Sequence, residues 1–106
     1  MGLESMIEDD ARVYMESLGG VLMKWVSPGN KGVPDRIACH PNCGVFVMEF
    51  KAPKRTLRKN QNSMCDKLAG AGMRVYANVS NIKKAREIIE DEVNRTGPRH
   101  VIVSGL

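Results

Sequence analysis

The sequence lacks any long hydrophobic run: nowhere do about 18 consecutive apolar residues occur, which is the length that a membrane-spanning helix needs. Residues 1–4 do not begin a basic region followed by an apolar core, as a secretory signal would. We therefore expect a protein that is neither secreted nor membrane-spanning and that works in the cytoplasm.

Cysteine is also scarce. The chain has three, Cys39, Cys43 and Cys65, which is an odd number without the spacing of a disulfide scaffold and fits a reducing compartment. Cys39, His40 and Cys43 are zinc-ligating residue types, but the tight turn predicted there offers at most three ligands and no fourth is evident. A zinc site is therefore not expected.

Internal repeats, low-complexity stretches and linkers are absent as well. With 106 residues the chain is long enough for one core and too short for a second, so we expect one domain over residues 1–106. Hydrophobic residues make up 42% and charged residues 26%, which is ordinary for a folded protein and argues against disorder. Sixteen Lys and Arg against twelve Asp and Glu give a net charge of +4, which fits a polyanionic partner without requiring one.

Hydrophobic periodicity predicts alternating helices and strands. Apolar residues at three- and four-residue spacing predict helices over 3–18, from a cap at Thr56 to about Gly70, and over 82–93. Runs rich in strand-forming residues predict strands over 21–26, 35–39, 45–51 and 74–79, with a short one at 100–103. Residues 40–44 form the turn of a hairpin in this prediction. The order indicates an α/β fold with a mixed sheet flanked by helices.

Charged side chains interrupt two of these apolar runs, at Gly32-Val33-Pro34-Asp35 and at Glu49-Phe50-Lys51. Charge is costly among strand residues unless it binds a cation or takes part in chemistry. Alternation along a strand puts Glu49 and Lys51 on one side, about 7 Å apart, and Phe50 on the other. Asp35, at the start of the partner strand, can approach Glu49 across the hairpin. The pattern predicts a metal-dependent active site.

Two carboxylates that converge repel each other unless a cation lies between them. Magnesium suits such a pair because it takes oxygen ligands and keeps waters and substrate phosphate in its other positions, and the backbone carbonyl of Phe50 could add a ligand. The alternative is a surface hairpin with a cross-strand pair of Glu49 and Lys51. The Gly-Val-Pro-Asp turn favours the site.

A basic run follows the acids directly. Residues 51–59 hold five basic side chains and no acid: Lys51, Lys54, Arg55, Arg58 and Lys59. Such a run is often only a solvated loop and helix start, but beside buried carboxylates it indicates a track for phosphates. Lys24 and Lys31 flank the same site and are either solvated or in contact with phosphate.

Pro34-Asp35, the thirteen residues 36–48 and then Glu49-Phe50-Lys51 resemble the PD-(D/E)xK nuclease signature. The fuller pattern resembles the VRR-NUC family in its compact stand-alone form, which is typical of phages and bacteria. It consists of Lys24, Ser27-Pro28-Gly29, Gly32-Val33-Pro34-Asp35-Arg36, Glu49-Phe50-Lys51-Ala52-Pro53, Gln61 and the strand of residues 72–79. The match covers roughly residues 4–90. It implies a restriction-endonuclease-like fold and an intracellular setting, for example a phage protein in a bacterial host.

The resemblance also implies roles for individual residues. Asp35 and Glu49 would be ligands of Mg²⁺ or Mn²⁺, Lys51 the catalytic lysine and Gln61 a site residue. A glutamate of the first helix would join them, for which we choose Glu8, with Glu4 one turn away left open. Ser5 to Glu8 also matches a capping box, in which Glu8 would bond only backbone amides, and Gln61 could equally bond a neighbouring backbone group. The residues expected to contact DNA are Lys24, Lys31, Arg36, Lys54, Arg55, Arg58 and Lys59.

These implications predict a divalent-metal-dependent endonuclease that acts on branched DNA. Compact family members are associated with symmetric cutting of four-way (Holliday) junctions, which needs two active sites and therefore a homodimer of so small a chain. Monomeric nicking of flaps is the alternative within this class. A nucleic-acid-binding module that keeps the fold without cleavage is the alternative from another class, although the intact set of Asp35, Glu49 and Lys51 argues against it.

Overall fold

The computed structural model describes residues 2–52 and 59–95, with side chains in the second range described from residue 63 onward. The elements of this part of the chain are α1 (Leu3–Ser17), β1 (Val21–Lys24), β2 (Arg36–His40), β3 (Gly44–Phe50), α2 (Lys59–Gly70), β4 (Val75–Val79) and α3 (Ile82–Val93). They confirm the predicted order. The predicted cap at Thr56 and the strand at 100–103 lie outside the described residues. Within the described ranges, no helix is both long and apolar enough to span a membrane.

Helix α1 follows its apolar spacing closely. Ile7, Ala11 and Met15 are buried at four-residue intervals along one face. Gly19, at φ +90°, ends the helix, and the N–H of Gly20 donates to the carbonyl of Met15 at 3.0 Å. This is the Schellman arrangement, for which glycine is favoured because the left-handed backbone costs it little.

The start of α1 excludes one alternative from the sequence. The N-cap is Gly2, and no side chain caps the helix. Ser5 therefore lies inside the helix, where it cannot act as the first residue of a capping box. The capping role considered for Glu8 is wrong.

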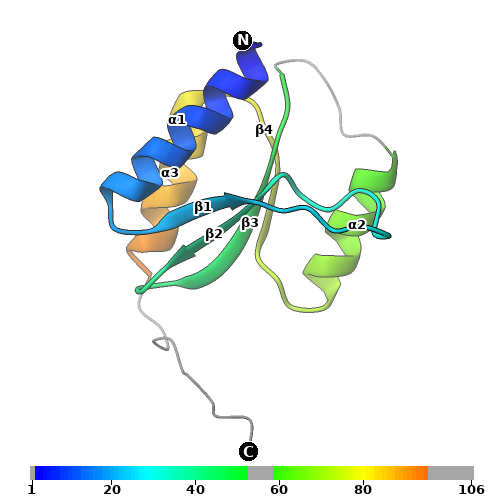
Figure 1. The fold of residues 1–106 in the computed structure, drawn as a ribbon. Helices are drawn as coiled ribbons and strands as arrows, with labels where there is room; N and C mark the ends of the chain where they lie inside the picture. The colour runs from blue at the N-terminus through cyan, green and yellow to red at the C-terminus, as the bar shows by residue number, and fades with distance from the viewer. Residues whose placement is uncertain (1, 53–58, 96–106) are drawn as a thin grey trace, which may run out of the picture.

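The four strands form one sheet in the order β1-β2-β3-β4 (Figure 1). β1 and β2 pair antiparallel, β2 and β3 pair antiparallel, and β4 runs parallel to β3. The predicted mixed sheet is thus confirmed. The parallel pair requires a long crossover, which contains α2.

The two faces of the sheet differ in what packs on them. Phe46, Met48 and Phe50 alternate along β3 and join one buried core with side chains of α1 and α3. The residues between them, Val47 and Glu49, therefore point to the opposite face. In Figure 1, α1 and α3 lie together on one side of the sheet, and α2 lies apart from them beside β4.

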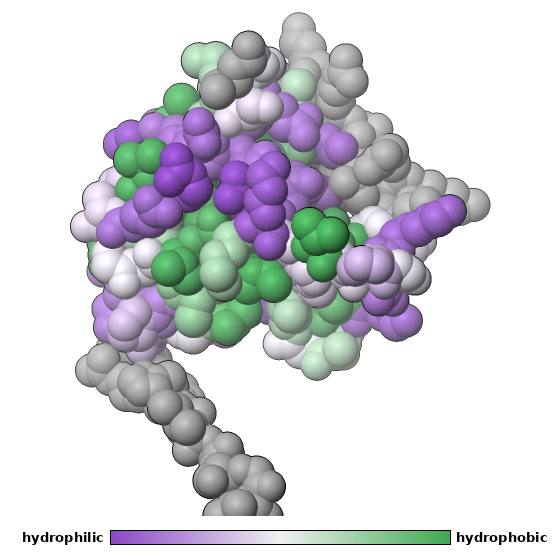
Figure 2. Space-filling view, in the orientation of Figure 1, coloured by the Kyte–Doolittle hydropathy of each residue, from purple (hydrophilic) through white to green (hydrophobic). Residues whose placement is uncertain are grey.

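Part of this opposite face is exposed and apolar. The strand register places Val21 across from Cys39 and Cys39 across from Val45, and it places Met23 across from Ile37. We call these five residues the apolar face. Val21, Met23 and Val45 are 42%, 52% and 45% exposed. Figure 2 shows hydrophobic side chains gathered over β1 and β2.

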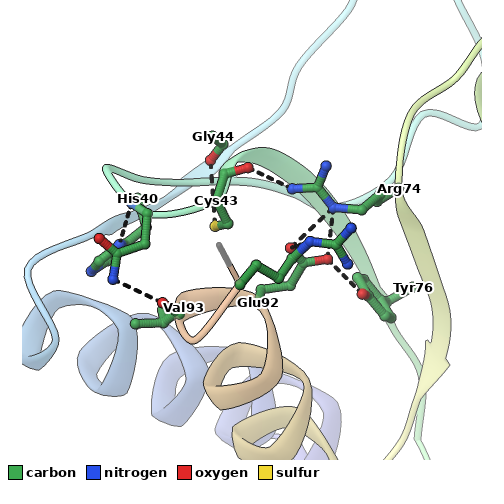
Figure 3. Close-up of polar contacts among 9 residues, drawn as sticks. His40, Cys43, Gly44, Arg74, Tyr76, Glu92 and Val93 are labelled. Atoms are coloured by element: carbon green, nitrogen blue, oxygen red, sulfur yellow. Dashed lines mark hydrogen bonds and ion pairs between the residues drawn. The ribbon is translucent and has the colours of Figure 1, made fainter. Parts of the chain in front are cut away.

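A buried acid holds α3 against β4 and the hairpin turn (Figure 3). Glu92 is fully buried and accepts hydrogen bonds from Nε of Arg74 at 2.8 and 3.0 Å and from the hydroxyl of Tyr76 at 2.5 Å. Arg74 also donates to the carbonyl of Cys43 at 2.7 Å. A buried carboxylate is tolerated only when it is paired in this way. The network therefore fixes the end of α3 against β4 and the turn between β2 and β3.

Candidate active site

The loop before β2 fixes the backbone of Asp35. Gly32 adopts φ +81°, a conformation that suits glycine, and Pro34 is buried. The carbonyl of Asp35 accepts a hydrogen bond from the N–H of Trp25 at 3.0 Å. Asp35 therefore enters the sheet in a defined position, as its turn residues predict.

Asp35 and Glu49 are brought together by the hairpin register. Arg36 pairs with Met48, so one step further along the ladder Asp35 stands opposite Glu49. The carboxylate Oδ2 of Asp35 accepts a hydrogen bond from the backbone N–H of Phe50 at 2.9 Å. The convergence expected from the sequence is present.

Glu49 is fully buried on the face opposite to the α1–α3 core. Burial, followed by the hydrogen bond and the negative charge of Asp35, raises the pKa of Glu49 from 4.5 to about 9, while the ammonium of Lys51 acts in the opposite direction. Ionising both of these neighbouring carboxyl groups costs free energy, because the two negative charges repel each other. A cation between them would relieve the repulsion.

Lys51 lies directly beyond the last residue of β3. Its N–H donates to the carbonyl of Val79 at 3.0 Å, which extends the pairing of β3 with β4 to this residue. Its charge acts on Glu49, and its side chain is half-buried. An ammonium thus accompanies the acid pair, as the alternation of the strand predicts.

Helix α1 offers two glutamates, and the structure places them differently. Nε of Arg36 donates to Oε1 of Glu8 at 2.6 Å, and Nη1 of Arg36 donates to the carbonyl of Leu22 at 3.1 Å. Arg36 is only 8% exposed and, as the partner of Met48, lies on the α1 face. This differs from the DNA contact that the sequence predicted for Arg36, because its guanidinium is buried and engaged inside the protein.

Glu4, one turn before Glu8, is the α1 carboxylate whose charge contributes to the raised pKa of Glu49. Lys24, 71% exposed, has its ammonium 4.0 Å from Glu8. Of the two α1 glutamates, therefore, Glu8 is held by Arg36, whereas the charge of Glu4 makes the last and smallest contribution to the raised pKa of Glu49.

Helix α2 carries a buried thiol that the charges of the acid pair reach. Cys65 is buried, and burial raises the pKa of its thiol, with further contributions from the charges of Glu49, Asp66 and Asp35. Sequence reasoning did not place Cys65 within reach of the charges of these acids.

Several predicted site residues cannot be compared with this geometry. Gln61 is on α2, one turn before Cys65, and Lys59 begins the helix, but their side chains lie outside the described residues. Lys54, Arg55 and Arg58 lie outside them entirely. Lys31 is exposed in the loop after β1.

The turn that carries zinc-ligating residue types is occupied by backbone contacts instead. Nδ1 of His40 accepts the N–H of Asn42 at 3.0 Å, and Nε2 lies 2.8 Å from the carbonyl of Leu18. Nε2 must then carry the proton, and neither ring nitrogen is left for a metal. His40 therefore has a structural role at the hairpin.

The donor set of Asp35 and Glu49 fits a hard divalent ion. Among the described side chains there is no group of three or more His, Cys, Asp and Glu that could hold a metal. Mg²⁺, however, is commonly bound by one or two carboxylates together with waters and substrate phosphate. Burial and then the neighbouring Asp35 raise the pKa of Glu49, and a bound cation would offset the repulsion between the two carboxylates.

Comparison with known proteins agrees with this geometry. A solved structure described as "VRR_NUC domain" superposes with a TM-score of 0.76 over 85% of this chain and 97% of that one, at 23% sequence identity. The chain has the fold of a VRR_NUC domain. The resemblance inferred from the sequence is confirmed at the level of the fold, as is the restriction-endonuclease-like α/β class.

A sequence relative points the same way. "Putative nuclease p44" of Acyrthosiphon pisum secondary endosymbiont phage 1 is 42% identical over 50 residues, which are 47% of this chain and 54% of the relative. The chain thus matches about half the length of that curated relative. No family model matches the sequence.

Proposed function

We propose that the protein is a divalent-metal-dependent DNA endonuclease that hydrolyses phosphodiester bonds in branched DNA. The observation that carries the proposal is the pair formed by the half-buried Asp35 and the fully buried Glu49, with Lys51 beside it. A protein that only binds nucleic acid has no use for converging acids next to a polyanion. The VRR_NUC fold and the phage nuclease relative support the same conclusion.

Hydrolysis forms a bond from a water oxygen to phosphorus, breaks one P–O bond to a sugar oxygen and returns a proton to the leaving oxygen. Mg²⁺ or Mn²⁺, when bound, would polarise the phosphoryl oxygen and lower the pKa of a bound water. Asp35, Glu49 and the backbone carbonyl of Phe50 would hold the ion. Lys51 would orient the attacking water or offset the negative charge that develops on the phosphorus oxygens.

The remaining site residues would assist from the two helices. We assign the assisting carboxylate of α1 to Glu4, because its charge acts on Glu49 whereas Glu8 is engaged by Arg36. Gln61 would contribute from α2. Basic residues near the site would hold the DNA backbone, where phosphate contacts position the substrate without reading its sequence. They are Lys24, Lys31, Lys54, Arg55, Arg58 and Lys59.

Symmetric cutting of a four-way junction would require two copies of the chain, since the pair of Asp35 and Glu49 supplies one site. The apolar face supports a homodimer. A stable interface buries roughly 800 Å² on each partner, and the exposed side chains of Val21, Met23 and Val45 supply an apolar centre for such an area.

The decisive experiment is a cleavage panel of labelled four-way junctions, flaps, hairpins and linear duplexes with Mg²⁺, Mn²⁺ or a chelator. We expect cleavage of branched substrates with either metal and none with the chelator. Sizing of the protein alone and with a junction accompanies the panel. Metal-independent binding without cleavage of any substrate would instead identify a binding module that keeps the fold.

A further inference from the structure

A hollow of about 180 Å³ lies between the loop after β1 and helix α2. The described residues that line it are Lys31, Ser63, Met64 and Lys67. Figure 1 shows this loop running alongside α2. The loop continues to Asp35, and the next helix residue after Met64 is Cys65, which the charges of Glu49 and Asp35 reach. The loop and the helix that border the hollow are thus the segments that lead to Asp35 and to Cys65.

The hollow is chemically suited to an anion. Lys31 and Lys67 bring two positive charges to it and Ser63 brings a hydroxyl, and no described lining residue is acidic. Ser63 and Lys67 are four residues apart and therefore share one face of α2. Within the described part of the chain, the ion pairs that form involve neither lysine. Two ammonium groups that border one space attract negative charge into it.

We propose that this Lys31–Lys67 hollow binds a backbone phosphate of the nucleic acid other than the phosphate that is cleaved. The inference rests on the proposed function, which brings a phosphodiester strand to Asp35 and Glu49. Lysine binds phosphate as a compact point charge, and the hydroxyl of Ser63 can donate to a phosphate oxygen. A second phosphate held beside the site would fix the register of the strand without reading its bases.

The test compares Lys67→Ala with Lys83→Ala. Lys83 is exposed on α3, which packs on the other face of the sheet, so the control removes the same charge away from the hollow. Binding of a fluorescent DNA duplex is measured in chelator, which prevents metal-dependent cleavage, over a series of salt concentrations. We expect Lys67→Ala to bind more weakly and its plot of log Kd against log salt concentration to be shallower by about 0.9.

Lys83→Ala should retain the slope of the unaltered protein, and the double variant Lys31→Ala/Lys67→Ala should lose about 1.8 from it. Lys67→Arg should restore most of the binding, because it keeps the charge. Equal slopes for Lys67→Ala and Lys83→Ala, or no binding of the unaltered protein at the lowest salt, would overturn the inference.

The two proposals can fail separately. Cleavage of branched DNA with Mn²⁺ is measured on the same preparations. If the unaltered protein cleaves while Lys67→Ala and Lys83→Ala bind alike, the hollow is rejected and the nuclease function stands. If no substrate is cleaved while Lys67→Ala alone weakens binding, the nuclease function is rejected and phosphate binding in the hollow is supported.

Discussion

The carboxylate of Asp35 accepts a hydrogen bond of 2.9 Å from the backbone N–H of Phe50. This bond links the residue before β2 to the last residue of β3 and holds Asp35 next to Glu49. Because the backbone supplies the donor, the position of the carboxylate does not depend on a bound ion. The acid pair is thus held in place for the cation proposed above, an arrangement that would favour tight and specific coordination.

Asp35→Asn should abolish binding of divalent metal and stabilise the metal-free fold. The amide oxygen can still accept the hydrogen bond from Phe50, but the charge that opposes ionisation of Glu49 is gone. Calorimetric titration with Mn²⁺ and urea unfolding in chelator measure the two effects. Asp91→Asn, an exposed aspartate on α3, is the matched control. Equal Mn²⁺ affinity in Asp35→Asn and the unaltered protein would remove Asp35 from the site.

Substitutions of Glu4 and Glu8 should affect different properties, namely metal binding and stability. Glu8→Gln is expected to destabilise the fold by about 3 kcal/mol, because it leaves the buried guanidinium of Arg36 without its charged partner. Glu4→Gln should leave the free energy of unfolding nearly unchanged and weaken Mn²⁺ binding. Urea unfolding and calorimetry on both variants decide between them. A stable Glu8→Gln that no longer binds metal would restore the assignment first made from the sequence.

Val21→Glu should convert a dimer into a monomer. The substitution places a charge within the apolar face, where an interface would have to desolvate it. Val13→Glu is the control, because Val13 is also an exposed valine, 56% accessible, but lies on α1. Analytical ultracentrifugation gives the mass of each variant, and circular dichroism checks that it is folded. If both variants remain dimeric, the interface lies elsewhere, and a monomeric parent protein would favour nicking over junction resolution.

Tyr76 should make stability depend on pH in the alkaline range. Burial, followed by its hydrogen bond to Glu92, raises the pKa of Tyr76 from 10.0 to about 12. The folded state therefore holds the phenolic proton more tightly than the unfolded state, so this contribution is complete below pH 10 and is lost as the pH rises toward about 12. Tyr76→Phe should be less stable at neutral pH but should lose less stability between these limits. Parallel curves of unfolding free energy against pH would contradict this account.

Much of the fold was predictable because its segments have strong local patterns. Periodicity identified α1, the four strands and α3. The pairing of Asp35 with Glu49 also followed, since a short hairpin turn between two strands fixes which residues stand opposite each other.

The partners of buried charges were not predictable, since they come from segments far apart in the sequence. Arg36 stands next to Asp35 in the sequence and was therefore predicted to contact DNA. The strand register turns it to the α1 face, where it donates a hydrogen bond to Glu8, which lies 28 residues earlier in the sequence. Glu92 did leave a local signal that was missed. It shares the spacing of Ala85, Ile88 and Ile89, so it lies on the buried face of α3.

The central claim is that the acid pair and its lysine perform metal-dependent hydrolysis, and single-turnover cleavage of a four-way junction by Lys51→Ala tests it most directly. The variant should fold, bind DNA and bind Mn²⁺, but cleave roughly 10²- to 10³-fold more slowly, which corresponds to about 2.7 to 4 kcal/mol of lost transition-state stabilisation. Lys83→Ala, which removes an exposed lysine of α3 away from the site, should cleave at nearly the parent rate. A Lys51→Ala variant with unchanged turnover would contradict the account.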